Sequence, residues 1–212
     1  YIIYTGGTTG MPKGVLWRQA DIYVAALGGR KPDGSEHESA ESIVSHARRG
    51  KARALPAPPF MHGASSWNAF TTFYAGGTVI VQNDVQRLDA DDVWRTAERE
   101  RVTSMLIVGD AFARPLIDQL HKAKYDLSRL RLLVSGGAPL NRSFKHELHE
   151  LLPGLTILDA VGSSETGRQG QVASTTKSEV TAGTFRPMPD NFVLSEDRTH
   201  VLEVGCDDVG WL

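Results

Sequence analysis

The stretch TGGTTGMPKGV, residues 5–15, decides how this sequence is interpreted, and it directly follows the apolar residues 1–4. Four glycines, three threonines, one proline and one lysine stand within it. Glycine permits positive φ and a close approach of a bound group, so that successive N–H groups and threonine hydroxyls can point at one anion. Lys13 adds a positive charge, and the stretch therefore predicts a phosphate-binding loop. On glycine and lysine alone, a plain surface turn is an equal alternative.

Two common nucleotide-binding patterns do not fit this loop. A Walker A loop places lysine directly after its last glycine and serine or threonine next, whereas here Met11 and Pro12 separate Gly10 from Lys13, and Gly14 follows. A dinucleotide G-x-G-x-x-G pattern is also absent from the sequence.

The bulk composition is that of a globular protein. Of the 212 residues, 41% are hydrophobic and 23% are charged, and the formal net charge of −2 gives no general attraction to nucleic acid. The single cysteine excludes an internal disulfide, and no apolar run is long enough to span a membrane, so a cytoplasmic protein is expected. Both ends fall in apolar stretches, which suggests a piece of a longer protein.

Short β-rich runs alternate with longer amphipathic segments along the chain. This alternation predicts an α/β fold with a layered, mostly parallel β-sheet flanked by helices. The expected strands are residues 1–4, 78–81, 103–108, 130–134 and 155–158, and the expected helices are residues 19–27, 65–74, 90–101, 111–122 and 142–151. Asp89 and Asn141 are good N-caps for two of the helices. In such a fold ligand loops lie at the carboxyl ends of the strands, where we expect residues 5–14.

The remaining segments interrupt this rhythm. Residues 28–50 are predicted to be a polar loop or insertion, and residues 167–190 irregular chain. We expect residues 1–190 to form one nucleotide- and acyl-binding α/β subdomain. Residues 191–212, where short strand patterns begin, would start a β-rich subdomain.

Two further glycine clusters each follow a predicted strand. SGGAPL, residues 135–140, offers a flat backbone edge for an aromatic base, or else is only a tight turn closed by Pro139. DAVGSSETG, residues 159–167, contains a carboxylate beside hydroxyls that could hold Mg²⁺ while a nucleotide supplies the other oxygens, although it could equally be a capped helix start. Three such loops after three strands of one sheet would converge on one ligand.

In this order and spacing the three loops resemble the adenylate-forming superfamily, which includes acyl- and aryl-CoA synthetases, luciferases and peptide-synthetase adenylation domains. Residues 4–14 match its Y-T-S-G-T-T-G-x-P-K-G signature, with Gly6 where serine is common. Residues 136–139 match its G-G-A-P, and residues 161–165 its Y-G-x-T-E, with Val161 where an aromatic normally stacks on adenine. PFMH, residues 59–62, is similar to a segment that borders the acyl pocket, although a lone histidine is more often structural. The resemblance favours the phosphate loop over a surface turn.

The resemblance implies ATP, Mg²⁺, CoA and a carboxylic acid as ligands. It implies that Thr5, Gly6, Gly7, Thr8, Thr9, Gly10 and Lys13 form the triphosphate loop, with Thr5, Thr8, Thr9 and Lys13 at the β- and γ-phosphates. It places Gly136, Gly137, Ala138, Pro139, Asp159, Val161, Gly162 and Ser163 on the adenine side of the site. Ser164 would contact the α-phosphate, Glu165 would hold Mg²⁺, and His62 would line or gate the acyl site.

The implied activity is formation of an acyl-adenylate and pyrophosphate, followed by thioester formation with CoA. The family's ribose-binding aspartate and its C-terminal domain with the catalytic lysine would lie outside residues 1–212, so we expect little or no turnover from this chain. The segment MHGASSW, residues 61–67, lacks the carboxylate that pairs with an amino-acid ammonium group, which disfavours amino-acid substrates. Residues 108–116, together with VGSSETG at residues 161–167, look most like actinobacterial acyl-CoA synthetases that handle fatty acids or steroid-derived acids.

Other functional classes are less well supported. Residues 162–166 lack the closing glycine of a serine-hydrolase G-x-S-x-G motif, and HELHE, residues 146–150, misses the zinc motif H-E-x-x-H by one position. Two alternatives stay open: a nucleotide-binding module without catalysis, and an acyl-AMP ligase that passes its product to a carrier protein.

Overall fold

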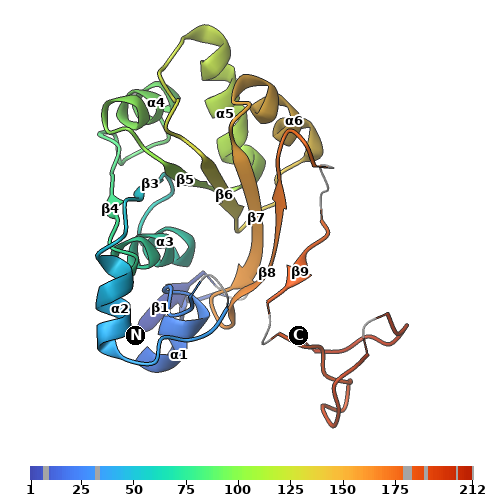
Figure 1. The fold of residues 1–212 in the computed structure, drawn as a ribbon. Coiled ribbons are helices and arrows are strands. Elements are labelled where there is room, and N and C mark those ends of the chain that lie inside the picture. Colours follow the sequence, from blue (N-terminus) through green and yellow to red (C-terminus); the bar gives the residue numbers. More distant parts are fainter. Residues whose placement is uncertain (7–9, 32–33, 179–182, 189–190, 204, 212) are drawn as a thin grey trace.

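A seven-stranded mixed sheet organises the chain (Figure 1). The computed structural model describes residues 1–6, 10–31, 34–178, 183–188, 191–203 and 205–211. The strands are β3 (Arg53–Pro56), β4 (Thr78–Val79), β5 (Ser104–Ile107), β6 (Leu132–Gly136), β7 (Thr156–Ser163), β8 (Gly167–Ser174) and β9 (Arg186–Pro187). Their order is β4-β3-β5-β6-β7-β8-β9, with parallel pairing from β4 to β7 and antiparallel pairing beyond. The predicted α/β class with a mostly parallel sheet is confirmed.

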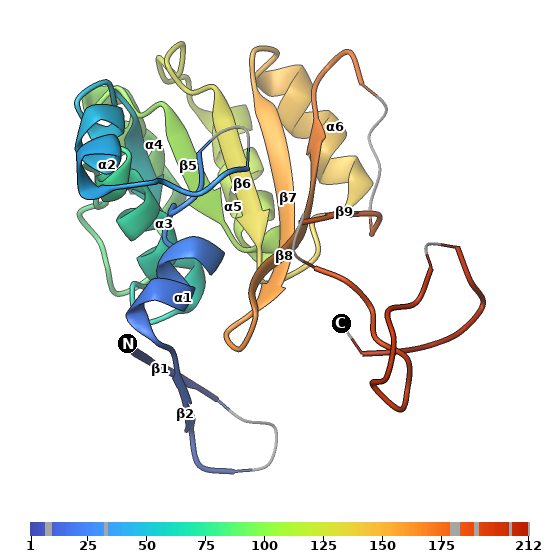
Figure 2. The same ribbon diagram turned by 60° about the horizontal axis from the view of Figure 1, so that its bottom comes forward.

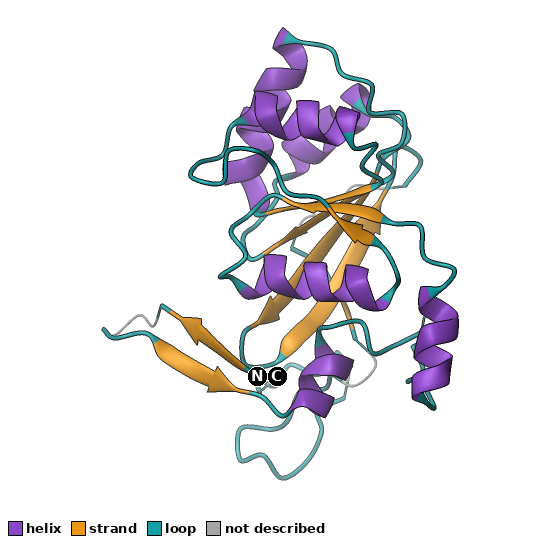
Figure 3. Cartoon of the chain, turned by 90° about the vertical axis from the view of Figure 1, so that its left-hand side faces the viewer, coloured by secondary structure: helices purple, strands orange, loops and turns teal. Residues whose placement is uncertain are grey.

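Helices cover both faces of the parallel part of the sheet (Figure 3). They are α1 (Gln19–Ala25), α2 (Ala40–Ala47), α3 (Gly63–Tyr74), α4 (Ala90–Arg99), α5 (Gly109–Lys122) and α6 (Arg142–Leu151). The last three pack side by side on one face, and α3 lies on the other. All five helices predicted from the sequence are present, with ends shifted by a few residues.

The main core lies between the sheet and the layer formed by α4, α5 and α6. From the strands it contains Leu55, Met105, Ile107, Leu133 and Ile157, and from the helices it contains Val93, Trp94, Leu116, Ile117, Leu120 and Leu148. These side chains recur with the period of each element, so one face of every strand and one stripe of every helix is apolar. The resulting burial fixes the strand register and hence the positions of the loops at the sheet edge.

Local signals place the helices where the sequence predicts them. Asp89 is the N-cap of α4, and its carboxylate accepts hydrogen bonds from the backbone N–H groups of Asp91 and Asp92, both at 3.1 Å. The indole Nε1 of Trp94 donates to the backbone carbonyl of Leu116 at 2.9 Å, which links α4 to α5 inside the core. The two helices are therefore joined by a polar contact as well as by apolar packing.

The first strand is the main correction to the prediction. β1 (Ile2–Thr5) pairs antiparallel with β2 (Lys13–Leu16) in a separate two-stranded sheet, which projects from the body in Figure 2. The described residues on both sides of the glycine-rich stretch therefore belong to a hairpin, with Thr5 paired to Lys13, and the expectation that the stretch follows a strand of the main sheet was wrong. An apolar tetrad carries no information about its pairing partner, so the sequence pattern could not reveal this arrangement.

Several other elements were missed. β3 ends in a proline-rich run, and proline argues against a strand. Residues 167–190 are not wholly irregular, because they contain β8 and β9; β8 is rich in glycine and glutamine, and its pairing with β7 overrides weak local propensity. Within the predicted loop at residues 28–50, α2 begins at its N-cap Ser39, whose hydroxyl accepts from the Ser42 N–H at 3.2 Å. None of the α2 side chains is buried, so this helix lacks the long apolar stripe by which a helix is recognised in a sequence.

Beyond β9 the described chain leaves the body as a segment that loops back on itself (Figure 1). It holds isolated bridges between Leu194 and Val201 and between Leu194 and Trp211. The expected division of the chain near residue 190 stays a prediction.

Candidate nucleotide-binding site

The carboxyl ends of four parallel strands bring most of the predicted site residues to one edge of the sheet. His62 follows β3, the loop at residues 136–139 follows β6, and residues 161–165 lie at the end of β7. Gly109, which the sequence analysis did not select, follows β5. Ligand sites of open α/β sheets occupy this edge. The fold thus places the second and third glycine clusters side by side.

The glycine-rich hairpin loop presents its described residues to solvent. Thr5 and Lys13 face each other as the last pair of the β1–β2 ladder, and Lys13, Gly6 and Gly10 are exposed. Gly10 has φ of +130°, a conformation that residues with side chains rarely adopt. Gly7, Thr8 and Thr9 lie outside the described residues.

Two hydrogen bonds and one buried side chain hold the hairpin against the body of the molecule. The indole Nε1 of Trp17, directly after β2, donates to the backbone carbonyl of Ser164 at 2.8 Å. On the other side, the indole Nε1 of Trp67 donates to the Tyr1 hydroxyl at 3.3 Å, and Ile3 is buried. The base of the hairpin therefore lies against the turn that carries the third glycine cluster, whereas Thr5 and Lys13, which border the glycine-rich stretch, pair at the opposite end of the β1–β2 ladder. The convergence of the first cluster with the other two stays a prediction.

The loop at residues 136–139 is held by the start of α5. Gly109 donates its N–H to the Ser135 hydroxyl at 3.2 Å, and the Asp110 N–H donates to the Pro139 carbonyl at 3.1 Å. The Asp110 carboxylate accepts from the Asn141 N–H at 2.8 Å and also from the Asn141 side-chain amide. Asn141 is the N-cap of α6 as predicted, but its side chain binds Asp110 and makes no capping hydrogen bond.

These bonds leave the surface of the second loop open. Gly137, Ala138 and Pro139 are exposed, and Gly137 has φ of +84°. A flat backbone edge free of bulky side chains suits a planar aromatic ring. The loop remains a predicted adenine contact.

The turn between β7 and β8 carries the third cluster. Gly162 lies so close to the Gly167 carbonyl that a Cβ at this position would collide with it, which explains the glycine. The Ser163 and Thr166 hydroxyls are 2.9 Å apart, and the Glu165 N–H donates to the Ser163 hydroxyl at 3.3 Å. These bonds shape the turn, at which Val161 is 39% exposed.

Glu165 itself is exposed in this turn, and Ser164 is half-buried. A single carboxylate fits Mg²⁺ that arrives with a nucleotide, because Mg²⁺ binds through one or two carboxylates plus phosphate oxygens and water. Within the described part of the chain, no three histidine, cysteine, aspartate or glutamate side chains are grouped to hold a metal ion by themselves.

Asp159 occupies a buried position below the second and third clusters. It lies opposite Ser135 in the β6–β7 ladder, and its carboxylate forms an ion pair with the ammonium group of Lys145 on α6. Burial raises the pKa of Asp159, and the hydrogen bond and charge of Lys145 oppose that rise. The predicted adenine contact is therefore also part of a buried charge pair.

His62 is the N-cap of α3 but makes no side-chain capping bond, and its side chain is exposed. The next residue, Gly63, lies against Ile3 and Trp67, so a side chain there would press on both. The PFMH segment thus lies beside the docked hairpin. Phe60 and Met61, the residues before His62, are also exposed and give this region an apolar surface.

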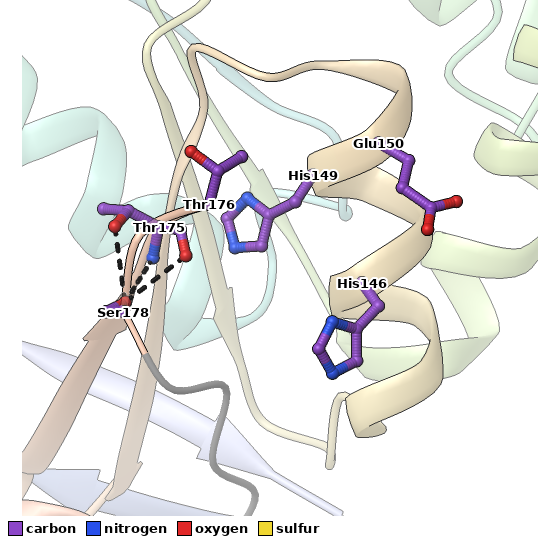
Figure 4. A pocket seen from close by; sticks show the side chains of 6 residues that line it. All are labelled: His146, His149, Glu150, Thr175, Thr176 and Ser178. Atoms are coloured by element: carbon purple, nitrogen blue, oxygen red, sulfur yellow. Dashed lines mark hydrogen bonds between the residues drawn. The ribbon is translucent and has the colours of Figure 1, made fainter.

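The HELHE segment faces a different part of the molecule. His146, His149 and Glu150 line a cavity of about 200 Å³ together with Thr175, Thr176 and Ser178 (Figure 4). In that view the His149 and Glu150 side chains leave the helix in opposite directions. His149 is buried, its Nε2 lies 3.4 Å from the Ser174 hydroxyl, and its Nδ1 has no hydrogen-bond partner. This arrangement gives no support to a zinc site.

The comparison with protein-family models decides the family. The AMP-binding enzyme family model matches residues 1–207. The chain belongs to the AMP-binding enzyme family. The resemblance drawn from the three glycine clusters is thereby confirmed.

Curated members of the AMP-binding enzyme family are similar to the chain. The medium-chain acyl-CoA ligase Mig of Mycobacterium avium is 46% identical over the whole of this chain and 39% of its own length. A 3-oxocholest-4-en-26-oate–CoA ligase of Rhodococcus rhodochrous is 34% identical over 99% of this chain and 39% of its own length. The chain thus spans well under half of these relatives.

Solved structures of AMP-binding enzymes share the fold. The N-terminal domain of FACL13 from Mycobacterium tuberculosis has a TM-score of 0.72 at 23% identity, covering 95% of this chain and 46% of that one. A long-chain-fatty-acid–CoA ligase from Archaeoglobus fulgidus has a TM-score of 0.69 at 21% identity, covering 97% and 40%.

Sequence reasoning missed three residues that organise this site: Trp17, Asp110 and Lys145. Each acts through a partner distant in sequence, so local patterns could not identify its role. A signal existed for Lys145, because a lysine among apolar positions of a helix needs a buried partner. Asp110 lies in the segment selected for its resemblance to particular ligases, and its contact with Asn141 gives that segment a structural role.

Proposed function

We propose that this chain supplies the nucleotide-binding part of an ATP-dependent acyl-CoA synthetase that activates fatty or steroid-derived acids. The hydrogen bond between Trp17 and Ser164 carries the proposal, because it anchors the base of the hairpin that bears the glycine-rich loop at the β7–β8 turn. The identity to curated acyl-CoA ligases supports the reaction class. ATP, Mg²⁺, CoA and the acid are the proposed ligands.

In the proposed reaction the carboxylate of the acid attacks the α-phosphorus of ATP and pyrophosphate leaves. The thiol of CoA then attacks the acyl carbonyl, so that a thioester forms and AMP leaves. Phosphoryl chemistry of this kind depends on neutralising and positioning the phosphate oxygens. Lys13 and the threonines of the hairpin loop would bind the β- and γ-phosphates, Ser164 the α-phosphate, and Glu165 the Mg²⁺.

The acyl site is proposed near His62. Phe60 and Met61 are exposed on the same segment, beside the docked hairpin, and apolar side chains there suit a hydrocarbon or sterol chain. We propose that His62 lines this site. A cytoplasmic location also stays a prediction.

The test is a calorimetric titration of Mg·ATP into the purified chain, after circular dichroism has shown that each variant is folded. Lys13→Ala should weaken binding about tenfold to a hundredfold, because a hydrogen bond to a charged group contributes roughly 1.5–3 kcal/mol. Lys124→Ala, which removes an exposed lysine after α5, is the matched control and should bind as the unmodified chain does. Equal binding by the Lys13 and Lys124 variants would remove Lys13 from the phosphate site.

A folded chain that binds no Mg·ATP would contradict the proposal for this chain. Mixing the chain with a fatty acid, Mg·ATP and CoA tests the acyl-AMP ligase alternative. We expect little or no acyl-adenylate from the chain itself, as would also hold for a nucleotide-binding module without catalysis. An acyl-AMP ligase would release adenylate but make no CoA thioester.

A further inference from the structure

The buried ion pair between Lys145 and Asp159 joins the elements that carry the second and third glycine clusters. Lys145 belongs to α6, which begins directly after the loop at residues 136–139, and Asp159 belongs to β7, which ends in the turn at residues 161–165. The side chains are 1% and 9% exposed, so both are withdrawn from solvent. The pair therefore lies between the two segments and close to each.

The sheet register shows how close the pair lies to the predicted adenine side. Asp159 pairs with Ser135, and the next residue, Ala160, pairs with Gly136, the first glycine of the second cluster. A Cβ added to Gly136 would lie 3.3 Å from the Ala160 carbonyl, so the two chains touch at this point. A displacement of the chain at Asp159 would consequently also displace the backbone of both clusters.

Burying a lysine ammonium is costly unless a partner compensates, and removing one partner leaves the other uncompensated. Such a pair is a poor choice for stability alone, because apolar side chains of similar volume often serve equally well. The buried ammonium and carboxylate compensate each other only while they remain in contact, so the pair constrains the separation of α6 and β7 at this point. Asp159 is also a predicted contact on the adenine side of the nucleotide site. An apolar side chain in its place would remove the carboxylate from that site.

We propose that Lys145 is a positioning residue for nucleotide recognition, because its pair with Asp159 holds the loop at residues 136–139 and the turn at residues 161–165 in register. The inference rests on the proposed function for its ligand. Lys145 acts through Asp159 and makes no contact with the nucleotide. Burial raises the pKa of Asp159, and Lys145 opposes that rise, so the lysine also favours the ionised carboxylate.

The experiment compares Mg·ATP with inorganic tripolyphosphate and Mg²⁺, which has the phosphates but no adenine. Lys145→Met removes the charge and keeps the length of the side chain. We expect its dissociation constant for Mg·ATP to rise at least tenfold, while that for tripolyphosphate changes less than twofold. Lys122→Met, the same change at an exposed lysine at the end of α5, should alter neither value. Lys145→Arg, which retains a positive charge, should restore part of the affinity for Mg·ATP.

A uniform loss of both affinities would overturn the proposal, because a general structural defect would weaken both. Unchanged affinity for Mg·ATP would also overturn it. Should the methionine variant fail to fold, Lys145→Gln keeps a hydrogen-bond donor near Asp159 and takes its place, with the same expected selective loss.

Hydrogen exchange of the ligand-free chain separates this inference from the proposed function. In the Lys145 variant we expect at least fivefold faster exchange in peptides covering residues 136–141 and 161–166, with no change in α4. Absence of Mg·ATP binding by the unmodified chain would contradict the proposed function, and the exchange data would still decide the positioning role. Unchanged exchange in both segments would overturn that role.

Discussion

The indole Nε1 of Trp17 donates a 2.8 Å hydrogen bond to the backbone carbonyl of Ser164, a residue 147 positions away in the sequence. This bond links a small antiparallel hairpin to the end of a strand in the main sheet. A glycine-rich loop on a hairpin of its own can bind a ligand together with the sheet only if the hairpin is held in place. Trp17 supplies such a link at the base of the hairpin, directly after β2.

Replacing Trp17 by phenylalanine should loosen the hairpin. The variant keeps most of the aromatic surface but loses the donor, and a typical hydrogen bond contributes about 1 kcal/mol to stability. Urea unfolding should therefore show that the free energy of unfolding falls by about 1 kcal/mol. Hydrogen exchange in the peptide covering residues 1–16 should become faster. Trp211→Phe is the control, because its indole Nε1 donates to the Glu196 carbonyl in the C-terminal segment. Equal exchange in the hairpin of both variants would contradict the docking role of Trp17.

Replacing Asp110 by alanine should free the loop at residues 136–141. The carboxylate accepts from the backbone N–H of Asn141 and from its side-chain amide, and both bonds would be lost. Because the site is exposed, water can replace these partners, and we expect a stability loss of only about 1 kcal/mol. Exchange of the loop amides should increase severalfold. Asp118→Ala, at an exposed position of the same helix, should leave the loop unchanged.

A core substitution gives the largest expected effect on stability. Trp94→Phe removes the donor to the Leu116 carbonyl and leaves space around a smaller ring in a position that is 1% exposed. A buried acceptor that loses its partner costs about 1–3 kcal/mol, so thermal and urea unfolding should both show a loss in that range. A loss no larger than that of Trp211→Phe would mean that the buried hydrogen bond contributes little.

His149 should make stability depend on pH. Burial, together with the charges of His146 and Lys145, lowers the pKa of His149 below its ordinary value of 6.5. The unfolded chain then binds a proton that the folded chain excludes, so the contribution is fully present above about pH 6.5 and is lost as the pH falls through the folded-state pKa. Unfolding free energies from pH 7.5 to 5 should fall more steeply for the unmodified chain than for His149→Gln.

The control for this series is His121→Gln, which removes an exposed histidine paired with Glu147. The free energy of unfolding of this variant should fall between pH 7.5 and 5 as steeply as that of the unmodified chain. If His149→Gln and the unmodified chain show the same slope, the pH dependence belongs to other groups.

The sequence predicted those parts of the fold whose information is local. The helices with long apolar stripes, such as α4 and α5, were found, and so were the strands between them. β3 was missed because prolines follow it directly, and β8 because glycine and glutamine have low strand propensity. Both strands form through pairing with neighbouring strands that are distant in sequence, a cause that only the assembled sheet provides.

In the candidate site, too, the sequence predicted the features that depend on local residues and missed those that depend on distant partners. Three glycine clusters were recognised by their composition and order, because each needs special backbone geometry within a few residues. The second and third clusters lie on neighbouring strands of the main sheet, but the first does not follow a strand of that sheet, since β1 belongs to another one. The contacts of Trp17, Asp110 and Lys145 depend on partners elsewhere in the chain, so local patterns could not identify those partners, although the apolar positions around Lys145 indicate that it needs one.

The two outermost strands of the main sheet, β4 and β9, are only two residues long. Each covers a small part of the strand beside it and offers little free backbone of its own. Long, flat outer strands recruit strands from other molecules and lead to fibrous or amorphous deposits. In the part of the chain that the structure describes, β9 pairs with only Gly170 and Gln171 of the eight-residue β8, so the rest of that strand's outer edge is where a strand from another molecule could add to the sheet.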